Sequence, residues 1–149
     1  MPRPQPRPLS RDTAARIASS FLPGTLLGNR YHYYYARAKL RSDPLYPGVC
    51  AALRDAAGPL LDLGCGIGLL AHALQHEGIA LRYFGVDNDH RKIASARRAA
   101  ARAGLVDAGF EALDLSQALQ PQRQAEVVDA MVAMLEPGAK LVIRTGLDD

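Results

Sequence analysis

The sequence predicts an α/β protein with a doubly wound, mostly parallel sheet and helices on both of its faces. At 60–70 the residues LLDLGCGIGLL form a short apolar run that ends in an acid, passes through alternating glycines and becomes a helical pattern. Strand-like stretches follow at 81–87 and 109–115, with an amphipathic helical pattern over 89–104 between them. Strands that alternate with helices are typical of parallel sheets covered on both faces.

The glycines Gly64, Gly66 and Gly68 predict a tight turn between a buried strand and a helix. Glycine is needed where the backbone turns sharply or must let a ligand approach the main chain. The helix that follows offers free N–H groups and the positive end of its dipole. The turn therefore suits a nucleotide-like or nucleoside-like ligand, and an ordinary strand-to-helix turn is the alternative interpretation.

Acids also follow the next two strands. Asp87 ends the second strand roughly twenty residues past the glycine loop, where a carboxylate usually accepts hydrogen bonds from ribose hydroxyls. Its alternative role is to cap the next helix, although Asn88 or Asp89 could fill that role. Asp114 ends the third strand, and its alternative role is a turn or a cap before Ser116.

This arrangement resembles the class I, Rossmann-like S-adenosylmethionine-dependent methyltransferases. Their first motif, acid-x-G-x-G-x-G, matches Asp62 and the three glycines, whereas dinucleotide-binding loops have the spacing G-x-G-x-x-G. The resemblance implies S-adenosylmethionine as the cofactor and S-adenosylhomocysteine as the product. The cofactor-binding residues that it implies are Asp62, Gly64, Cys65, Gly66, Gly68, Asp87, Asn88, Asp114 and Leu115.

The resemblance also implies a role for each group. The glycines would let the backbone approach the amino-acid part and the ribose, and Asp62 would act through the loop or on the cofactor's amino group. Asp87 would hold the ribose hydroxyls, and Asp114 with Leu115 would bind the adenine. No catalytic residue or general base is assigned by the sequence.

Ahead of the glycine loop, four of the six tyrosines lie in the stretch YHYYY at 31–35. At helical spacing Tyr31 and Tyr35 share one face, with Tyr34 beside them. One interpretation is an amphipathic helix packed on the domain by its rings. The other is a lid in which Tyr31, Tyr35 and Lys39 cover the ligand, with Tyr35 and His32 in reach of a substrate.

We expect the chain to have three parts: a disordered Pro/Arg-rich tail over 1–10, a helical cap over 11–58, and the methyltransferase core over 59–149. Asp12 or Thr13 would cap the first helix of the helical cap.

Two further helical features can be predicted. Asp43 as the N-cap and Pro44 in the first turn would begin a helix that buries a stripe of Leu45, Val49 and Leu53. In the helix after the glycine loop, His72 and His76 stand four residues apart. Because the zincin pattern H-E-x-x-H is absent, we expect surface histidines and no metal site.

The resemblance weakens toward the C-terminus. A helix is expected over 122–135 and a strand over 139–144, which with Pro137 and Gly138 resembles the family's fifth strand. No stretch matches the fourth strand, which in the family lies between the first and the fifth, and no sixth or seventh strand is evident. Without the fourth strand its two neighbours would lie about 9.6 Å apart, twice the ladder spacing, with no hydrogen bonds across the gap.

Two explanations of the missing strand are open. The first explanation, which we favour because both flanks match the family, is that residues around 119–122 and after 149 are missing from this sequence. Alternatively, the strand at Leu141 pairs directly with the strand at Leu60.

Composition narrows the functional class. The net charge is +3, and the two cysteines, Cys50 and Cys65, have no paired spacing, which favours reduced thiols in a cytoplasmic protein. No apolar run approaches the ~20 residues that span a bilayer. We expect methyl transfer to an unidentified, small-molecule acceptor, with nucleic acid possible but not favoured and the oligomeric state unknown. The alternatives are a non-catalytic remnant of the same fold and an NAD(P)-dependent oxidoreductase.

Overall fold

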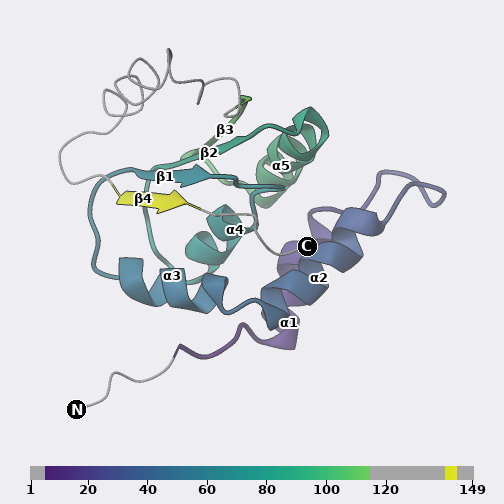
Figure 1. Ribbon diagram of the computed structural model, residues 1–149. Helices are drawn as coiled ribbons and strands as arrows, with labels where there is room; N and C mark the ends of the chain where they lie inside the picture. The colour runs from purple at the N-terminus through teal and green to yellow at the C-terminus, as the bar shows by residue number, and fades with distance from the viewer. Residues whose placement is uncertain (1–5, 115–139, 144–149) are drawn as a thin grey trace. The chain divides into compact units, whose positions relative to one another are not determined.

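The computed structural model describes residues 6–114 and 140–143 (Figure 1). Within these ranges the chain divides into two compact units. The first unit comprises Leu69–Ala80, Arg98–Val106 and the described part of Met1–Ala56; the second comprises Ala57–Gly68, Leu81–Arg97 and the described residues from Asp107 onward. Helix α5 (His90–Ala103) crosses this division, and its buried residues Ile93, Ala96 and Ala100 follow its amphipathic pattern.

The second unit is built on a parallel sheet with the strand order β3-β2-β1-β4 (Figure 1). Its strands are β1 (Leu60–Leu63), β2 (Tyr83–Asp87), β3 (Ala108–Ala112) and β4 (Lys140–Ile143). Leu63 pairs with Val86, and Asp87 pairs with Ala112. The carboxyl ends of β1, β2 and β3 therefore lie at one edge of the sheet. The α/β, Rossmann-like fold class expected from the sequence is confirmed.

The pairing of β4 corrects the sequence-based expectation. Lys140 pairs with Leu60 and Ile143 with Leu63, and the Lys140 amide donates to the Pro59 carbonyl at 2.8 Å. This is the direct pairing that we considered and did not favour. Its physical reason is the ladder itself, because a gap beside β1 would leave a row of buried N–H and C=O groups unpaired. The expected helix over 122–135 lies outside the described residues.

The first unit is helical. It contains α1 (Arg11–Ser19), α2 (Tyr31–Ser42), α3 (Leu45–Leu53) and α4 (Leu69–His76). Helix α1 contacts α2 and α4, and α3 also contacts α4. Among the described residues, none of the helices combines the length and the apolar character that a membrane crossing requires.

Helix α1 begins one turn earlier than its expected cap. Ser10 is the N-cap, and its hydroxyl accepts a hydrogen bond from the Thr13 amide at 3.1 Å. Asp12 and Thr13 lie inside the helix, so the expectation that one of them caps it was wrong. Leu9, just before the cap, is buried. A hydroxyl at the N-cap satisfies one of the helix's free amides.

The buried stripe of α3 also differs from the expected one. Tyr46, Cys50 and Leu53 are buried, whereas Leu45 and Val49 are half-buried. The buried face of α3 is shifted by one residue from the predicted face, because the large Tyr46 side chain is buried in place of Leu45. Tyr46 is only 1 % exposed. The expectation that Asp43 is the N-cap was wrong, because Pro44 holds that position. The Asp43 carboxylate still accepts from the Leu45 amide at 2.8 Å.

His72 of α4 is buried, contrary to the expectation of a surface histidine. It is 4 % exposed, and its ring centroid lies 5.4 Å from that of Phe21. Its Nε2 has no hydrogen-bond partner among the described residues. Burial disfavours the charged imidazolium and lowers the pKa of His72 from 6.5 to about 4. His76, one turn further, is exposed as expected and lies 3.1 Å from the Thr13 hydroxyl.

This burial predicts a pH-dependent stability. Between pH 6.5 and about 4 the unfolded chain binds a proton at His72 that the folded chain does not, so stability falls as the pH is lowered through that window. The loss contributed by His72 should reach on the order of 3 kcal/mol. Urea denaturation across this range should show a shallower dependence for His72→Leu than for the wild type.

The matched control is His76→Gln, which removes the exposed histidine of the same helix and should leave the steep dependence in place. Identical pH profiles for the wild type and His72→Leu would contradict the assignment.

Candidate functional site

The glycine loop between β1 and α4 has the backbone conformation that its sequence requires. Gly64, Gly66 and Gly68 have φ angles of 77°, 59° and 81°, in the left-handed region that residues with a side chain rarely adopt. The amides of Gly64 and Cys65 both donate to the Val86 carbonyl, at 2.7 and 3.0 Å. The loop is therefore held against the end of β2.

Asp87 joins three parts of this edge. Its Oδ2 accepts a hydrogen bond from the Gly66 amide at 2.9 Å, and its Oδ1 accepts from the Asp89 amide at 2.9 Å. Its backbone carbonyl accepts from the Leu113 amide at 2.9 Å. The structure thus brings together the glycine loop, the acid after β2 and the segment after β3, which the sequence predicted as one site.

Asp62 lies beneath the loop and is fully buried. Its Oδ2 accepts a hydrogen bond from the Tyr83 hydroxyl at 2.5 Å. The two roles considered for Asp62, through the loop or on the cofactor's amino group, both stay predictions. Tyr83 was not singled out by sequence reasoning, because the register that pairs it with Leu60, and so brings its hydroxyl within reach of Asp62, cannot be seen in either strand alone.

Cys65 is also buried, and its thiol faces Gly85 of β2. A Cβ atom at Gly85 would lie 2.8 Å from the Cys65 sulfur, so this strand position has room only for glycine. Cys65 is 1 % exposed. Its contribution to a ligand site would come from its backbone and not from its sulfur.

Two of the loop glycines differ in what surrounds them. A Cβ at Gly68 would lie 2.6 Å from the Phe110 ring, whereas a Cβ at Gly66 would meet nothing within 4 Å. Gly68 is thus required for packing, and Gly66 borders open space. Phe110, which also lies 5.6 Å from the Tyr83 ring, was missed by the sequence analysis.

The remaining candidates of this unit lie at its surface. Asn88 and Asp114 are exposed, whereas Leu115 lies outside the described residues. β3 ends at Ala112, two residues before Asp114. Leu113, another residue that sequence reasoning missed, is 42 % exposed although it is a large apolar side chain. Its signal in the sequence is an apolar residue directly beyond a strand end.

Two charged side chains near the site, those of Asp89 and Arg97, are engaged by backbone groups. The Asp89 carboxylate accepts from the amides of Lys92 and Arg91, which lowers its pKa. The Arg97 guanidinium donates to the Phe110 carbonyl at 2.7 and 3.2 Å. Among the described residues there is no group of three His, Cys, Asp or Glu side chains able to hold a metal ion.

The expected lid residues belong to the first unit. Tyr31 and Tyr35 stack with ring centroids 6.1 Å apart, and they are 66 % and 39 % exposed. Tyr33, in the same stretch, is half-buried, and the interpretation that these rings pack the helix onto the domain stays a prediction. Lys39 forms an ion pair with Asp43 at 3.1 Å. The lid role of Tyr31, Tyr35 and Lys39 stays a prediction.

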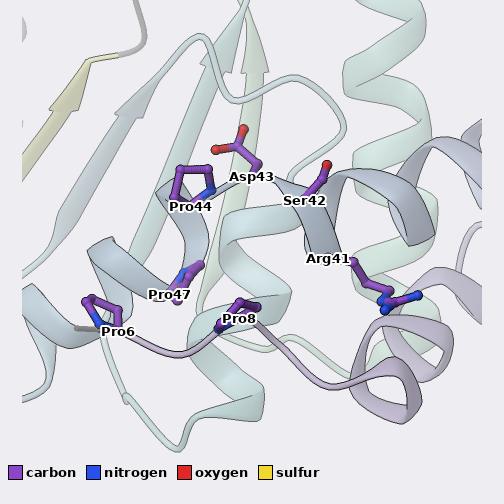
Figure 2. A pocket seen from close by; sticks show the side chains of 7 residues that line it. All are labelled: Pro6, Pro8, Arg41, Ser42, Asp43, Pro44 and Pro47. Atoms are coloured by element: carbon purple, nitrogen blue, oxygen red, sulfur yellow. The ribbon is translucent and has the colours of Figure 1, made fainter. Parts of the chain in front are cut away.

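A pocket of about 270 Å³ also lies in the first unit (Figure 2). Its wall consists mainly of proline rings, with Arg41, Ser42 and Asp43 on one side. Asp43 is engaged by Lys39 and by the Leu45 amide. The pocket contains none of the residues predicted to bind a ligand.

The contribution of the Tyr83–Asp62 hydrogen bond to the stability of the fold beneath the site can be tested by mutation. Tyr83→Phe would leave the buried Asp62 carboxylate without this donor and should lower the free energy of unfolding by about 1 to 3 kcal/mol. Chemical denaturation measures the loss. Tyr34→Phe, at a tyrosine that is 59 % exposed, should change stability by less than about 0.5 kcal/mol. Equal stability of Tyr83→Phe and the wild type would refute a structural role for this bond.

Comparison with known proteins supplies a family. A family model described as a methyltransferase domain matches residues 60–142, from β1 into β4. No curated protein matches the chain.

Solved structures with low similarity include three enzymes. PKMT2 from Rickettsia typhi, solved with AdoHcy, is 17% identical over 58% of this chain and 20% of its own, with a TM-score of 0.43. Coclaurine N-methyltransferase, bound to N-methylheliamine and SAH, is 19% identical over 69% of this chain and 30% of its own, with a TM-score of 0.41. The third is geranyl diphosphate C-methyltransferase from Streptomyces coelicolor A3(2), in complex with Mg2+, geranyl diphosphate and S-adenosyl-L-homocysteine. It is 18% identical over 73% of this chain and 49% of its own, with a TM-score of 0.40. The chain spans less than half the length of each of these proteins.

Proposed function

This chain belongs to the methyltransferase domain family, and we propose that it binds S-adenosylmethionine at the glycine loop and transfers its methyl group to an acceptor. The observation that carries the proposal is the Asp87 carboxylate, which accepts from the Gly66 amide at 2.9 Å. An acid at the end of a second strand, joined to a glycine loop at the end of the first, is suited to a ribose that lies across both.

Asp87 would bind the ribose hydroxyls. An ionised carboxylate has about four acceptor positions, and the Gly66 and Asp89 amides use one on each oxygen. The side chain is 9 % exposed, so only a ligand seated directly on the loop would reach it. The open space at Gly66 would admit the amino-acid part of the cofactor.

The adenine would lie beyond the ends of β2 and β3. Asn88, Asp114 and Leu115 are the candidates from sequence, and we add Leu113 because its exposed apolar side chain follows β3 directly. A carboxylate such as Asp114 could accept from the exocyclic amine. The apolar side chain would cover part of the ring and exclude water.

When bound, the cofactor supplies a methyl group on a sulfonium, which a nucleophile of the acceptor displaces in line. The residues of this chain would bind and orient the cofactor and exclude water from it. We propose a small-molecule acceptor and a cytoplasmic location, the latter because the two cysteines, Cys50 and Cys65, are buried and are not bonded to each other as a disulfide. Nucleic acid is less favoured, since Arg97 and Arg102 of α5 are engaged by backbone carbonyls.

A second candidate function is a cofactor-binding module without catalysis. The observation that favours it is the direct pairing of β1 with β4, where the resembled enzymes have a further strand. Such a module would bind the cofactor and fail to transfer the methyl group. The family match counts against the NAD(P)-dependent oxidoreductase alternative.

Calorimetry with S-adenosylhomocysteine tests the proposal. The wild type should bind with a Kd on the order of micromolar, and Gly66→Ala should weaken binding at least about tenfold because its methyl group enters the space reserved for the ligand. Gly104→Ala is the matched control: both glycines have positive φ angles, 59° and 70°, and neither Cβ would meet an atom within 4 Å. It should bind like the wild type.

Asp87→Asn should also weaken binding, because it removes the charge and one acceptor oxygen. A folded wild-type sample that binds no S-adenosylhomocysteine would rule out both candidate functions. Equal binding by Gly66→Ala and Gly104→Ala would place the ligand away from the loop.

A further inference from the structure

The loop between α1 and α2 presents two leucines to solvent. Leu26 is 90 % exposed and Leu27 is 99 % exposed. The Gly28 amide donates to the Thr25 carbonyl at 3.3 Å, which closes a turn with the leucines at its two central positions. Adjacent leucines at the tip of a turn forgo the burial that stabilises apolar side chains elsewhere.

The base of this loop is fixed. The Arg102 guanidinium donates to the Leu22 and Ser20 carbonyls, and Phe21 between them is buried. At the other side of the turn, Gly28 lies so close to Pro23 that a Cβ would approach the proline ring to 2.2 Å. In Figure 1 the segment between α1 and α2 projects beyond the end of α2. The leucines are thus held outward by an anchored loop.

Exposed aromatic side chains follow on α2, which begins four residues after Leu27. Tyr31 and Tyr34 are 66 % and 59 % exposed, whereas Ala36 and Leu40 on the opposite side of the helix are fully buried. Tyrosine combines an apolar ring with a polar hydroxyl and is enriched where an apolar phase meets water. The two leucines are therefore followed closely in the chain by exposed amphipathic side chains.

The charged residues between Asp12 and Asp43 are all basic. No aspartate or glutamate occurs between Asp12 and Asp43, while this stretch contains Arg16, Arg30, Arg37, Lys39 and Arg41. Lys39 is paired with Asp43. Arg30 and Arg41 are exposed, and Arg37 lies over the Tyr33 ring at 5.6 Å. The surface is complementary to an anionic partner.

We propose that this surface, defined by Leu26, Leu27, Arg30, Tyr31, Tyr34 and Arg41, docks on an anionic lipid bilayer. The leucines would enter the hydrocarbon, the tyrosines would lie at the level of the headgroups, and the arginines would contact lipid phosphates. Single-stranded nucleic acid also combines anions with stacking surfaces. A nucleic acid has no apolar phase in which two aliphatic side chains at a turn tip could be buried, whereas a bilayer has one.

Sedimentation with lipid vesicles tests the proposal. The full chain should bind vesicles of phosphatidylcholine mixed with phosphatidylglycerol more tightly than vesicles of phosphatidylcholine alone, and added salt should reduce the difference. Leu26→Ser with Leu27→Ser should weaken binding to the mixed vesicles at least about tenfold. Val106→Ser is the matched control, because Val106 is 91 % exposed and lies outside the loop; it should bind like the wild type.

Arg30→Gln with Arg41→Gln should bring binding to the mixed vesicles close to that on phosphatidylcholine alone. Circular dichroism should show all these variants to be folded, since each replaced side chain is exposed. The proposal is overturned if the folded wild type binds neither vesicle, or if the leucine variant binds as well as the wild type. It is also overturned if the protein binds a single-stranded oligouridine in preference to the mixed vesicles and the leucine variant retains that binding.

Discussion

The hydrogen bond from the Gly66 amide to the Asp87 carboxylate is the constraint on which the candidate site depends. The two residues are far apart in the chain, and the parallel pairing of β1 with β2 ends both strands at the same edge. The Val86 carbonyl, next to Asp87, fixes the loop through the Gly64 and Cys65 amides. Loop and acid are thereby preorganised, which lowers the conformational entropy that the protein must lose when a ligand binds. The same acid orders the Asp89 amide at the start of α5.

The sheet explains how β1 is held although it pairs directly with β4, where the resemblance implies a further strand between them. The row of hydrogen-bonding groups on β1 is satisfied by β4, in register from Leu60 to Leu63. The other side of β1 pairs with β2, so the strand that leads into the glycine loop is central in the sheet. Asp62, in the middle of β1, is fully buried and bonded to Tyr83. The loop therefore rises from a strand that is held on both sides.

Much of this site could be predicted from local patterns. The positions of Gly64, Gly66, Gly68 and Asp87 follow from the rule that strand ends carry the ligand site, and the amphipathic pattern places the buried face of α5. The bond between Tyr83 and Asp62, the packing of Phe110 against Gly68 and the exposed Leu113 depend on strand register, which local patterns do not give. The prediction that His72 lies at the surface was wrong because its ring partner, Phe21, comes from the turn after α1, far from His72 in the chain. The direct pairing of β4 with β1 was considered but not favoured, because the family resemblance was given more weight than the cost of unpaired backbone groups beside β1.

The central claim is that the glycine loop and the end of β2 form one cofactor site. Its most direct test is a titration of the ¹⁵N-labelled protein with S-adenosylhomocysteine, followed by amide NMR. The account predicts that the amides of Gly64, Gly66 and Asn88 shift together, with one common dissociation constant. Saturable binding that leaves these amides unmoved and shifts only residues of the helical unit would contradict it.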